Sequence, residues 1–345
     1  MSFSQDEALV LESIQQGISM AKRPFKMIGT EVGLDEKTVI QIISGLKKRR
    51  IIRNISGIFN PRRLGYEMGL VGMKVPMERI EQAAFVINAH PGVSHNYLRN
   101  HSCNMWFTLA EESDGQFVQT VDVLTYEAGA VETVVLKSGR VFKIGVNLPI
   151  VETQSRRPMQ VLKKGANVTG VTTLTREEKR AICLLQRDLP IVTRPFFGLL
   201  DINDPSIEEE RLIEIGVSLQ ARWIMRRYAA VLRHVNAGYP ENAMTVWKLG
   251  PEDATPDMID IFKKEQLVTH LYLRTCVRGV WGYPLFAMIH AREEKQLNEV
   301  IGRLYRASGR VDYRVLKTIR ELKKERVVYF SDAFGHWHNK QGLAN

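Results

Sequence analysis

Residues 95–99, His95-Asn96-Tyr97-Leu98-Arg99, recur 175 positions later as His270-Leu271-Tyr272-Leu273-Arg274. The two stretches share a His-x-Tyr-Leu-Arg pattern, and three shorter matches occur in the same order at offsets of 171 to 173. These pair Arg23-Pro24-Phe25 with Arg194-Pro195-Phe196, Ile51-Ile52-Arg53 with Ile224-Met225-Arg226, and Gly65-Tyr66 with Gly238-Tyr239. Four ordered matches at a nearly constant offset predict a tandem duplication of a unit of roughly 150 residues.

The first part of each unit has the pattern of a winged helix-turn-helix. In the first copy, apolar residues follow helical spacing over residues 5–16, and Asp35 is a suitable N-cap for a helix over 36–48. We expect residues 51–53 and 58–59 to form the hairpin of the wing. The second copy is expected to form helices over 176–188, 195–200 and 206–216, and a hairpin of 223–227 with 230–234.

The second part of each unit alternates strand and helix in the order β-α-β-β-α-β, which is ferredoxin-like. The expected elements of the first copy are 69–75, 77–89, 93–99, 104–110, 115–128 and 132–146. Those of the second copy are 243–249, 256–266, 268–275, 284–291, 294–308 and 311–316, followed by a basic helical tail over 317–326. The predicted fold class is therefore α+β, a tandem duplication of a winged helix-turn-helix and a ferredoxin-like domain. The predicted domain boundaries are 1–62, 63–148, a linker of 149–173, 174–238 and 239–330.

Charge and composition narrow the classes of partner. The chain has 345 residues, with 48 Lys plus Arg against 38 Asp plus Glu, a net charge of +10. This excess favours an anionic partner, such as nucleic acid, anionic lipid or a small molecule with several carboxylates or phosphates. The three cysteines, Cys103, Cys183 and Cys276, lack metal-binding or disulfide-framework spacing. The first residues are acidic where a signal peptide is basic, and no apolar run approaches the ~18–20 residues of a membrane span, so we expect a cytoplasmic protein without a membrane partner.

The repeated triplet has the spacing of a strand face. His95, Tyr97 and Arg99 occupy alternate positions, so their side chains share one face, and His101 continues that face if the strand extends so far. In the second copy the same face carries His270, Tyr272 and Arg274. A ferredoxin-like sheet has helices on one side only, and the intervening Leu98 suits that side. The His-Tyr-Arg face is then open to a ligand or a partner sheet, and we interpret it as a functional site.

The order of domains resembles the Lrp/AsnC family of bacterial regulators, and two longer stretches resemble a narrower branch. Residues 95–101 with 104–108 are similar to one subunit type of the sirohaem decarboxylases. Residues 238–247, with 270–274 and 283–290, are similar to the other type. The resemblance covers nearly the whole chain and implies a natural fusion of a D-type and an L-type subunit. It implies removal of CO2 from the C12 and C18 acetates of sirohaem, which gives 12,18-didecarboxysirohaem on the way to haem d1 or haem b.

The resemblance also implies roles for the repeated residues. Loss of CO2 requires a proton donor with a pKa near 7, which His supplies and Tyr assists, while Arg binds carboxylates bidentately. The predicted catalytic residues are His95, Tyr97, His101, His270 and Tyr272. The predicted substrate-binding residues are Arg99, Arg274, Arg226, Arg227, Trp106, Trp247 and Asn242. The substrate is an iron tetrapyrrole, no further cofactor is required, and the protein alone binds no metal, although His95 or His270 is an alternative ligand of the substrate's iron.

Structural roles compete with these assignments. Each Trp is at least as well explained by packing, and Asn242 could instead cap the start of a strand. The position equivalent to His101 is Cys276, so the two copies are chemically unequal and only one of them need be active.

Two other classes of function stay open at this point. In a DNA-binding regulator, residues 36–50, which end in four basic residues, would be a recognition helix, but the equivalent 206–216 contains four glutamates that repel phosphate. DNA binding is therefore not expected. A haem or sirohaem carrier without chemistry is the third possibility. We expect a homodimer, or an assembly with a second related decarboxylase, although the two copies could also pair within one chain.

Overall fold

The computed structural model describes residues 3–144, 170–201, 206–233, 238–276 and 281–343. The chain forms two compact units, residues 1–64 with 145–240 and residues 65–144 with 241–345. Each unit therefore combines the same half of both copies, with the helix-turn-helix segments in the first and the ferredoxin-like segments in the second. The α+β class and the duplication are confirmed, while most of the predicted linker lies outside the described residues.

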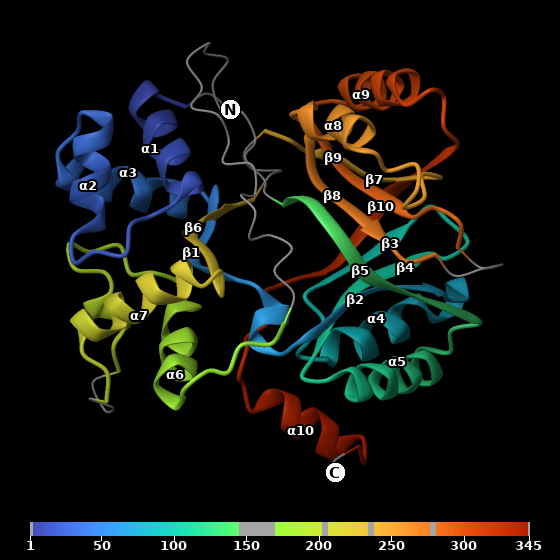
Figure 1. The fold of residues 1–345 in the computed structure, drawn as a ribbon, viewed down its shortest axis with the longest axis horizontal. Helices are drawn as coiled ribbons and strands as arrows, with labels where there is room; N and C mark the ends of the chain where they lie inside the picture. The colour runs from blue at the N-terminus through green and yellow to red at the C-terminus, as the bar shows by residue number, and fades with distance from the viewer. Residues whose placement is uncertain (1–2, 145–169, 202–205, 234–237, 277–280, 344–345) are drawn as a thin grey trace. The chain divides into compact units, whose positions relative to one another are not determined.

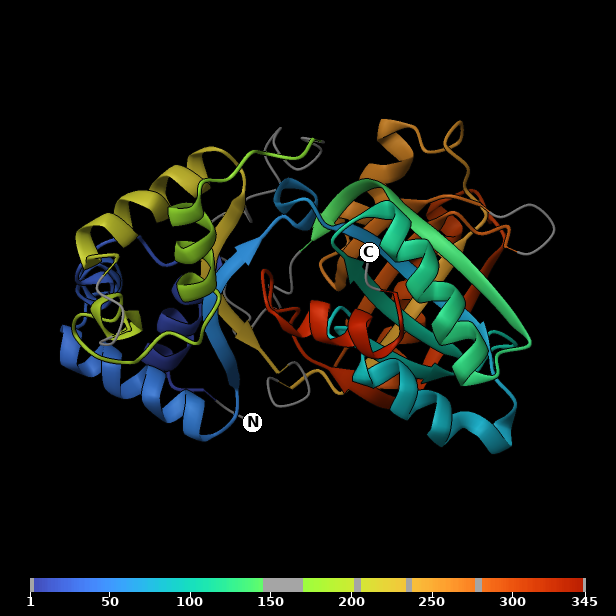
Figure 2. The ribbon, with the colours of Figure 1, turned by 90° about the horizontal axis from the view of Figure 1, so that it is seen from below.

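The first unit consists of helices packed on a two-stranded sheet (Figures 1 and 2). Its N-caps follow the sequence, since Asp35 accepts a hydrogen bond from the Thr38 amide and Ser4 forms a capping box with Glu7. The elements are α1 (Gln5–Gln16), α2 (Pro24–Val32), α3 (Glu36–Lys48), β1 (Ile52–Phe59), a 3-10 turn (Pro61–Leu64), α6 (Arg176–Leu185), a 3-10 turn (Phe197–Leu199), α7 (Glu209–Ala221) and β6 (Met225–Leu232).

The predicted wing hairpins are wrong. Each segment forms one continuous strand, and β1 pairs antiparallel with β6 of the other copy, with Ile55 opposite Ala230. Gly57, the natural turn residue of a hairpin in the first copy, stays in the ladder opposite Tyr228. A Cβ at Gly57 would lie 2.8 Å from the Phe59 ring, so the glycine allows close packing instead of a turn. His234, at the end of the second predicted hairpin, lies outside the described residues.

The helix predicted over 195–200 is also wrong, because only the 3-10 turn Phe197–Leu199 forms there. Gly198 stands in the middle of this short segment, and glycine disfavours a helix interior by about 1 kcal/mol relative to alanine. The following helix, α7, begins at Glu209 and ends at Ala221, later at both ends than expected.

The second unit contains a closed barrel of eight strands in the order β10-β3-β4-β2-β5-β8-β9-β7. The first copy supplies β2 (Glu67–Lys74), a 3-10 turn (Met77–Arg79), α4 (Ile80–Ala89), β3 (His95–Arg99), β4 (Met105–Glu111), α5 (Asp114–Ala128) and β5 (Glu132–Ile144). The second copy supplies β7 (Glu241–Trp247), α8 (Pro256–Lys264), β8 (Val268–Arg274), β9 (Leu285–Ala291), α9 (Glu294–Ala307), β10 (Tyr313–Lys324) and α10 (Ala333–Lys340). The two copies thus pair within one chain.

The last strand of each copy crosses to the other copy and closes the barrel. The first half of β5 pairs with β2, and its second half, from Ser138, pairs with β8. In the same way β10 pairs first with β7 and then, from Thr318, with β3. The predicted helical tail over 317–326 is therefore wrong, because residues 317–324 continue β10 and fill the backbone hydrogen bonds of β3. The C-terminal helix comes later, as α10.

Helices cover the outside of the barrel, with α4 and α5 on the side of the first copy and α8 and α9 on the side of the second (Figure 1). Leu98 belongs to the core between the first copy's sheet and its helices, as predicted. A second core inside the barrel draws on both copies and includes Trp106, Leu136, Phe286 and Leu316.

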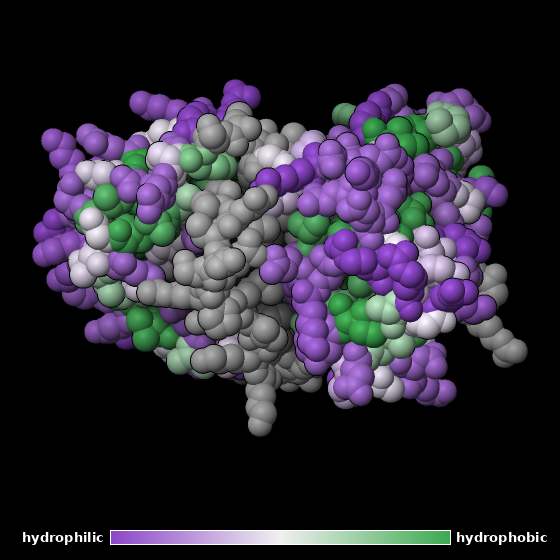
Figure 3. Space-filling model, turned by 90° about the horizontal axis from the view of Figure 1, so that it is seen from above, coloured by the Kyte–Doolittle hydropathy of each residue, from purple (hydrophilic) through white to green (hydrophobic). Residues whose placement is uncertain are grey.

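None of the helices among the described residues is long and apolar enough to cross a membrane. On the face drawn in Figure 3, hydrophilic residues cover most of the described surface, and hydrophobic residues gather in small separate areas.

Candidate functional site inside the barrel

The two His-Tyr-Arg faces point into the barrel. Tyr97 lies opposite Trp106 in the register of β3 and β4, and Tyr272 lies opposite Phe286 in the register of β8 and β9. Partners across antiparallel strands share a face, and both Trp106 and Phe286 belong to the inner core. The face that the sequence left open to a ligand or a partner sheet is thus turned toward the other copy of the same chain.

Within each copy the histidine and tyrosine are stacked and the arginine lies over the tyrosine. The ring centroids of His95 and Tyr97 are 6.3 Å apart at 27°, and those of His270 and Tyr272 are 6.1 Å apart at 18°. The guanidinium carbon lies 4.9 Å from the Tyr97 centroid in the first copy and 5.1 Å from the Tyr272 centroid in the second. The repeat seen in the sequence is therefore also a repeat of side-chain geometry.

Both arginines are buried, and each donates to the strand that the other copy contributes. Arg99 Nη1 donates to the Leu316 carbonyl at 2.8 Å and to Thr318 Oγ1 at 3.1 Å, and Arg274 Nη1 donates to the Leu136 carbonyl at 3.0 Å. Burial lowers the pKa of Arg99 to about 10. The two guanidinium groups join the copies, so their predicted role as carboxylate anchors is at most a second role and stays a prediction.

The two histidines differ in what their Nδ1 atoms meet. His95 Nδ1 lies 3.0 Å from Ser94 Oγ, which is 2.7 Å from Thr108 Oγ1. His270 Nδ1 lies 3.0 Å from Thr269 Oγ1, which is also 3.0 Å from Nδ1 of a second histidine, His290. Both His95 and His270 are partly exposed, so the imidazoles are placed to exchange protons as well as to pack.

His101 lies beside an aromatic cluster drawn from both copies. Its ring is 5.6 Å from Trp281, and Trp281 is 5.0 Å from Trp106, both in edge-to-face orientation. The backbone amide of Cys103 donates to His101 Nδ1 at 3.1 Å, and burial lowers the pKa of His101. Like Trp106 and Trp247, Trp281 is a tryptophan that the sequence offers for stacking on a tetrapyrrole, and packing explains it equally well.

Trp247 and Asn242, two predicted substrate-binding residues on β7, lie on opposite faces of the sheet. Trp247 stands on the helix side of the sheet, where its ring packs against Phe262 and Tyr313, and is not on the face of His270. Asn242 lies on the opposite face of β7, points inward and accepts a hydrogen bond from Thr318 Oγ1 at 2.9 Å. Since Thr318 also accepts from Arg99, Asn242 belongs to the arginine's network, and the substrate-binding role of Trp247 is corrected to a packing role.

Arg226 and Arg227 lie on β6 in the first unit, where burial lowers the pKa of Arg227. Their predicted contact with substrate stays a prediction.

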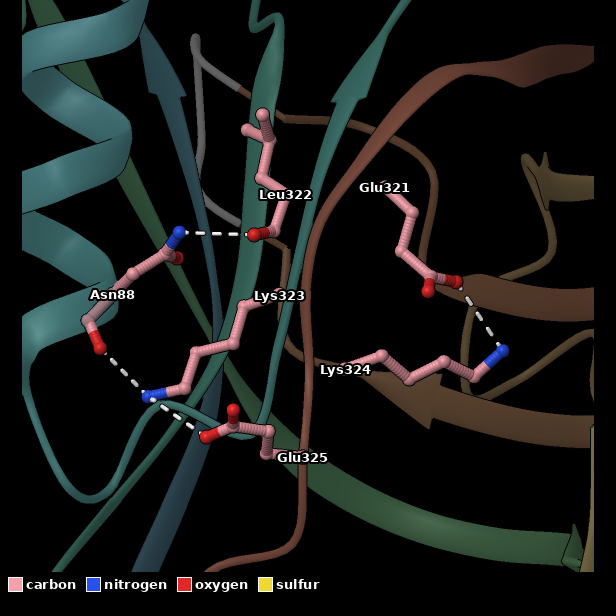
Figure 4. A pocket seen from close by; sticks show the side chains of 6 residues that line it. All are labelled: Asn88, Glu321, Leu322, Lys323, Lys324 and Glu325. Atoms are coloured by element: carbon pink, nitrogen blue, oxygen red, sulfur yellow. Dashed lines mark hydrogen bonds and ion pairs between the residues drawn. The ribbon is translucent and has the colours of Figure 1, made fainter. Parts of the chain in front are cut away.

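The register of β10 brings a charged pair to the His95 face that the sequence gave no reason to place there. Lys324 lies opposite His95 and Glu321 opposite Tyr97, and their side chains form an ion pair with an Nζ–Oε2 distance of 3.3 Å. Figure 4 shows this pair on one side of β10, while Lys323 points to the other side and donates to the Asn88 carbonyl at 2.7 Å. In the second copy, the residues opposite His270 and Tyr272 are Ile144 and Val141, so only the first copy has this pair.

Three potential metal ligands meet elsewhere in this unit. Nitrogens of His90 and His338 and a carboxylate oxygen of Glu111 lie within 4.8 Å of one another, and all three residues are buried. The Gly92 amide donates to His90 Nδ1 at 3.0 Å, which leaves the ring proton on Nε2, the atom 2.8 Å from Glu111. A metal-bound imidazole carries its proton on the opposite nitrogen, so this geometry fits a hydrogen-bonded cluster rather than a metal centre.

Comparison with known proteins agrees with this architecture. The family model described as "AsnC-like ligand binding domain" matches residues 63–143 and 236–323, and the model described as "Siroheme decarboxylase NirDL-like HTH domain" matches residues 7–53. The siroheme decarboxylase of Hydrogenobacter thermophilus is 36% identical over 329 residues, which span 95% of this chain and 96% of the relative.

Solved structures give the same result. The crystal structure of the siroheme decarboxylase NirDL is similar, with a TM-score of 0.74, 32% identity and coverage of 97% of this chain and 98% of that chain. The structure of siroheme decarboxylase NirDL in complex with an iron-uroporphyrin III analogue has a TM-score of 0.74 and 31% identity, over 98% of this chain and 99% of that chain. With its duplicated domains and its paired His-Tyr-Arg faces, this chain belongs to the siroheme decarboxylase family of the NirDL type.

Proposed function

We propose that this protein is a carboxy-lyase that removes CO2 from the C12 and C18 acetate groups of sirohaem to give 12,18-didecarboxysirohaem. The observation that carries the proposal is the pair of His-Tyr-Arg faces inside one barrel, in a chain that belongs to the siroheme decarboxylase family. A relative solved with an iron-uroporphyrin III analogue supports an iron tetrapyrrole as the class of substrate.

The chemistry requires a proton at the carbon that loses CO2. The acetate leaves as CO2, the electrons of the broken C–C bond stay on the methylene carbon, and a general acid converts it into a methyl group. His95 and His270 are our proton donors, each stacked with a tyrosine whose hydroxyl can hydrogen-bond the acetate or the acid. General acid catalysis contributes typically ~10²–10⁴-fold to a rate. Either histidine could alternatively ligate the substrate's iron.

We propose that positive charge binds the carboxylates of the substrate. Sirohaem carries eight carboxylates, and the net charge of +10 matches a polyanionic substrate. We propose Arg99, Arg274, Arg226 and Arg227 as carboxylate-binding candidates, with Asn242 and Trp106 lining the site. Lys324, on the His95 face, joins them as a cation that the register of β10 supports.

The test is anaerobic incubation of the purified chain with sirohaem, followed by mass spectrometry of the tetrapyrrole. We expect loss of two CO2 from the substrate, and turnover reduced at least ~10²-fold in His95→Gln and in His270→Gln. Full conversion by the double variant would exclude the histidines as proton donors. A bound tetrapyrrole of unchanged mass with the wild-type chain would instead identify a carrier.

A DNA-binding regulator is disfavoured by the acidic helix α7. Its glutamates form ion pairs within the first unit, Glu209 with Arg194, Glu210 with Lys22 and Glu214 with Arg211. An acidic helix at the position of a recognition helix would repel phosphate. We therefore expect no duplex binding near physiological salt, and gel-shift titration at 0.15 M salt checks this.

We further propose that the protein acts in the cytoplasm and as a homodimer, or with a second related decarboxylase. Sedimentation analysis of the pure chain separates the monomer from the dimer.

A further inference from the structure

A chain of three side chains links His270 to a second, buried histidine. Thr269 Oγ1 lies 3.0 Å from Nδ1 of His270 and 3.0 Å from Nδ1 of His290. Thr269 and His290 are each only 2% exposed, whereas His270 is partly exposed. The partly exposed imidazole of the candidate site is thus joined through one hydroxyl to an imidazole shielded from water.

This contact lies at a local irregularity of the sheet. Thr269 and His270 are neighbours on β8 and would ordinarily point to opposite faces. The register between β8 and β9 shifts between Val268 and His270, at the position of Thr269. His290, on β9, approaches the same hydroxyl from the adjacent strand. The first copy has the same contact between adjacent side chains, Ser94 Oγ with His95 Nδ1 at 3.0 Å, so the approach of His290 is what distinguishes the second copy.

The first copy lacks the second imidazole. Trp106 and Phe286 hold equivalent places opposite Tyr97 and Tyr272, so four residues further along, Ala110 is the counterpart of His290. In the first copy the chain from His95 consists of two hydroxyls, those of Ser94 and Thr108. A hydroxyl pair can orient an imidazole, but only a second imidazole can store a proton near neutral pH.

The single hydroxyl proton couples the two rings. Thr269 Oγ1 can donate to the Met288 carbonyl at 3.2 Å, in which case both Nδ1 atoms donate to the hydroxyl oxygen. When the hydroxyl instead donates to Nδ1 of His270, that ring carries its proton on Nε2, and His290 donates to the hydroxyl oxygen. The position of the hydroxyl proton therefore fixes the tautomer of His270, while His290 donates its Nδ1 proton to the hydroxyl in both arrangements.

We propose that His290 is a positioning and proton-supplying residue for His270, with Thr269 as the bridge; this rests on the proposed decarboxylation. His270 gives its Nε2 proton to the substrate carbon as the C–C bond to CO2 breaks, and the bond's electron pair forms the new C–H bond. His270 Nδ1 takes the Thr269 hydroxyl proton, and Thr269 takes the Nδ1 proton of protonated His290. His290 ends neutral, and His270 ends with its proton on Nδ1. Solvent then protonates Nε2 of the partly exposed His270, and the two transfers run back through Thr269 to return a proton to Nδ1 of His290.

Isosteric variants of the bridge test the proposal. Thr269→Val keeps the shape of the side chain without the hydroxyl, and Thr269→Ser keeps the hydroxyl. In the anaerobic sirohaem assay we expect Thr269→Val and His290→Gln to lower kcat roughly tenfold or more at unchanged KM, and Thr269→Ser to stay within about threefold of wild type. A Thr269→Val chain with the kcat of wild type, or an equal loss in Thr269→Ser, would overturn the relay.

A spectroscopic measurement separates failure of the relay from failure of the proposed function. In the wild-type chain, 15N NMR of labelled histidines should show His270 and His290 titrating in a coupled way, and Thr269→Val should uncouple them. Independent titration of the two rings in the wild type overturns the relay whatever the enzyme does. Coupled titration with no loss of CO2 from sirohaem would confirm the link between the two imidazoles and reject decarboxylation instead.

Discussion

At the scale of single residues, Arg99 and Arg274 show how a side chain predicted to meet a ligand can also hold the fold. Each guanidinium is buried and donates to a carbonyl of the strand exchanged from the other copy, at Leu316 and at Leu136. A buried carbonyl that loses its donor costs about 1–3 kcal/mol. These arginines therefore contribute to stability even without a substrate.

We predict that Arg99→Lys lowers the free energy of unfolding by about 1–3 kcal/mol. The shorter lysine side chain ends before the position of Nη1, which donates to both Leu316 and Thr318, and it lacks the planar group that stacks over Tyr97. Urea denaturation of the purified variant measures the change. Arg314→Lys, at an exposed arginine paired with Asp312, is the matched control and should shift the free energy by less than about 0.5 kcal/mol. Equal losses in both variants would contradict the buried role of Arg99.

At the scale of elements, each exchanged strand also carries a lysine that caps the C-terminal end of a helix of the other copy. Lys143 on β5 donates to the carbonyls of Lys263 and Glu265 at the end of α8, and Lys323 on β10 donates to those of Asn88 and His90 at the end of α4. Cations are favourable at helix C-termini, where carbonyls have no partner in the helix. In both copies, therefore, the strand that crosses to the other copy also caps a helix there.

Lys143 should make the free energy of unfolding depend on pH. Burial lowers its pKa from 10.5 to about 8, so the unfolded chain binds more protons there than the folded chain between these values, and stability should rise with pH across that window. We predict that wild type gains stability relative to Lys143→Met between pH 8 and 10, measured by thermal unfolding. Lys295→Met, at an exposed lysine on α9, should follow wild type, and a Lys143→Met curve parallel to wild type would refute the prediction.

The docking of α10 should depend on pH with the same sign, in a lower pH range. Glu111 accepts from Thr120 at 2.5 Å and lies within 3.1 Å of His90 and His338, and the Trp337 ring stacks edge-on over His90 at 4.3 Å. Burial lowers the pKa of His90 below 6.5, and the imidazole and hydroxyl partners lower that of Glu111 below 4.5. Both shifts mean that the unfolded chain takes up protons first on acidification, so stability is lost as pH falls through 6.5 and again below 4.5.

We predict that wild type loses thermal stability between pH 7.5 and 5.5, and that His90→Asn loses less. Asn keeps an acceptor for the Gly92 amide but does not titrate in this range. The control is His336→Asn, an exposed histidine on the same helix α10, which should keep the slope of wild type. The cluster would not be the origin of the acid sensitivity if His90→Asn kept that slope as well.

At the scale of the whole molecule, the sequence shows the repeat but not the exchange of strands between the two copies. The match of His95–Arg99 with His270–Arg274 predicts the duplication and the shared His-Tyr-Arg face, because a period of two and a fixed offset are properties of the sequence alone. It predicts an open face of a sheet, whereas the structure turns both faces into one barrel. The pairing of β10 with β3 joins residues more than 200 positions apart, and no local pattern signals it. The helix expected over 317–326 includes Lys324, whereas the register places Lys324 on a strand opposite His95.

The exchange of β5 and β10 predicts how the chain behaves when it is cut between its two copies. Residues 1–157 contain β2 to β5 and residues 158–345 contain β7 to β10, so neither fragment alone carries all eight strands of the barrel. Each would leave unpaired strand edges, which favour association with a complementary edge. We predict that the co-expressed fragments form a 1:1 complex whose thermal transition is cooperative, measured by size-exclusion chromatography with light scattering. Two fragments that fold and elute separately would show that the copies are independent domains and that the exchange of β5 and β10 does not hold the barrel together.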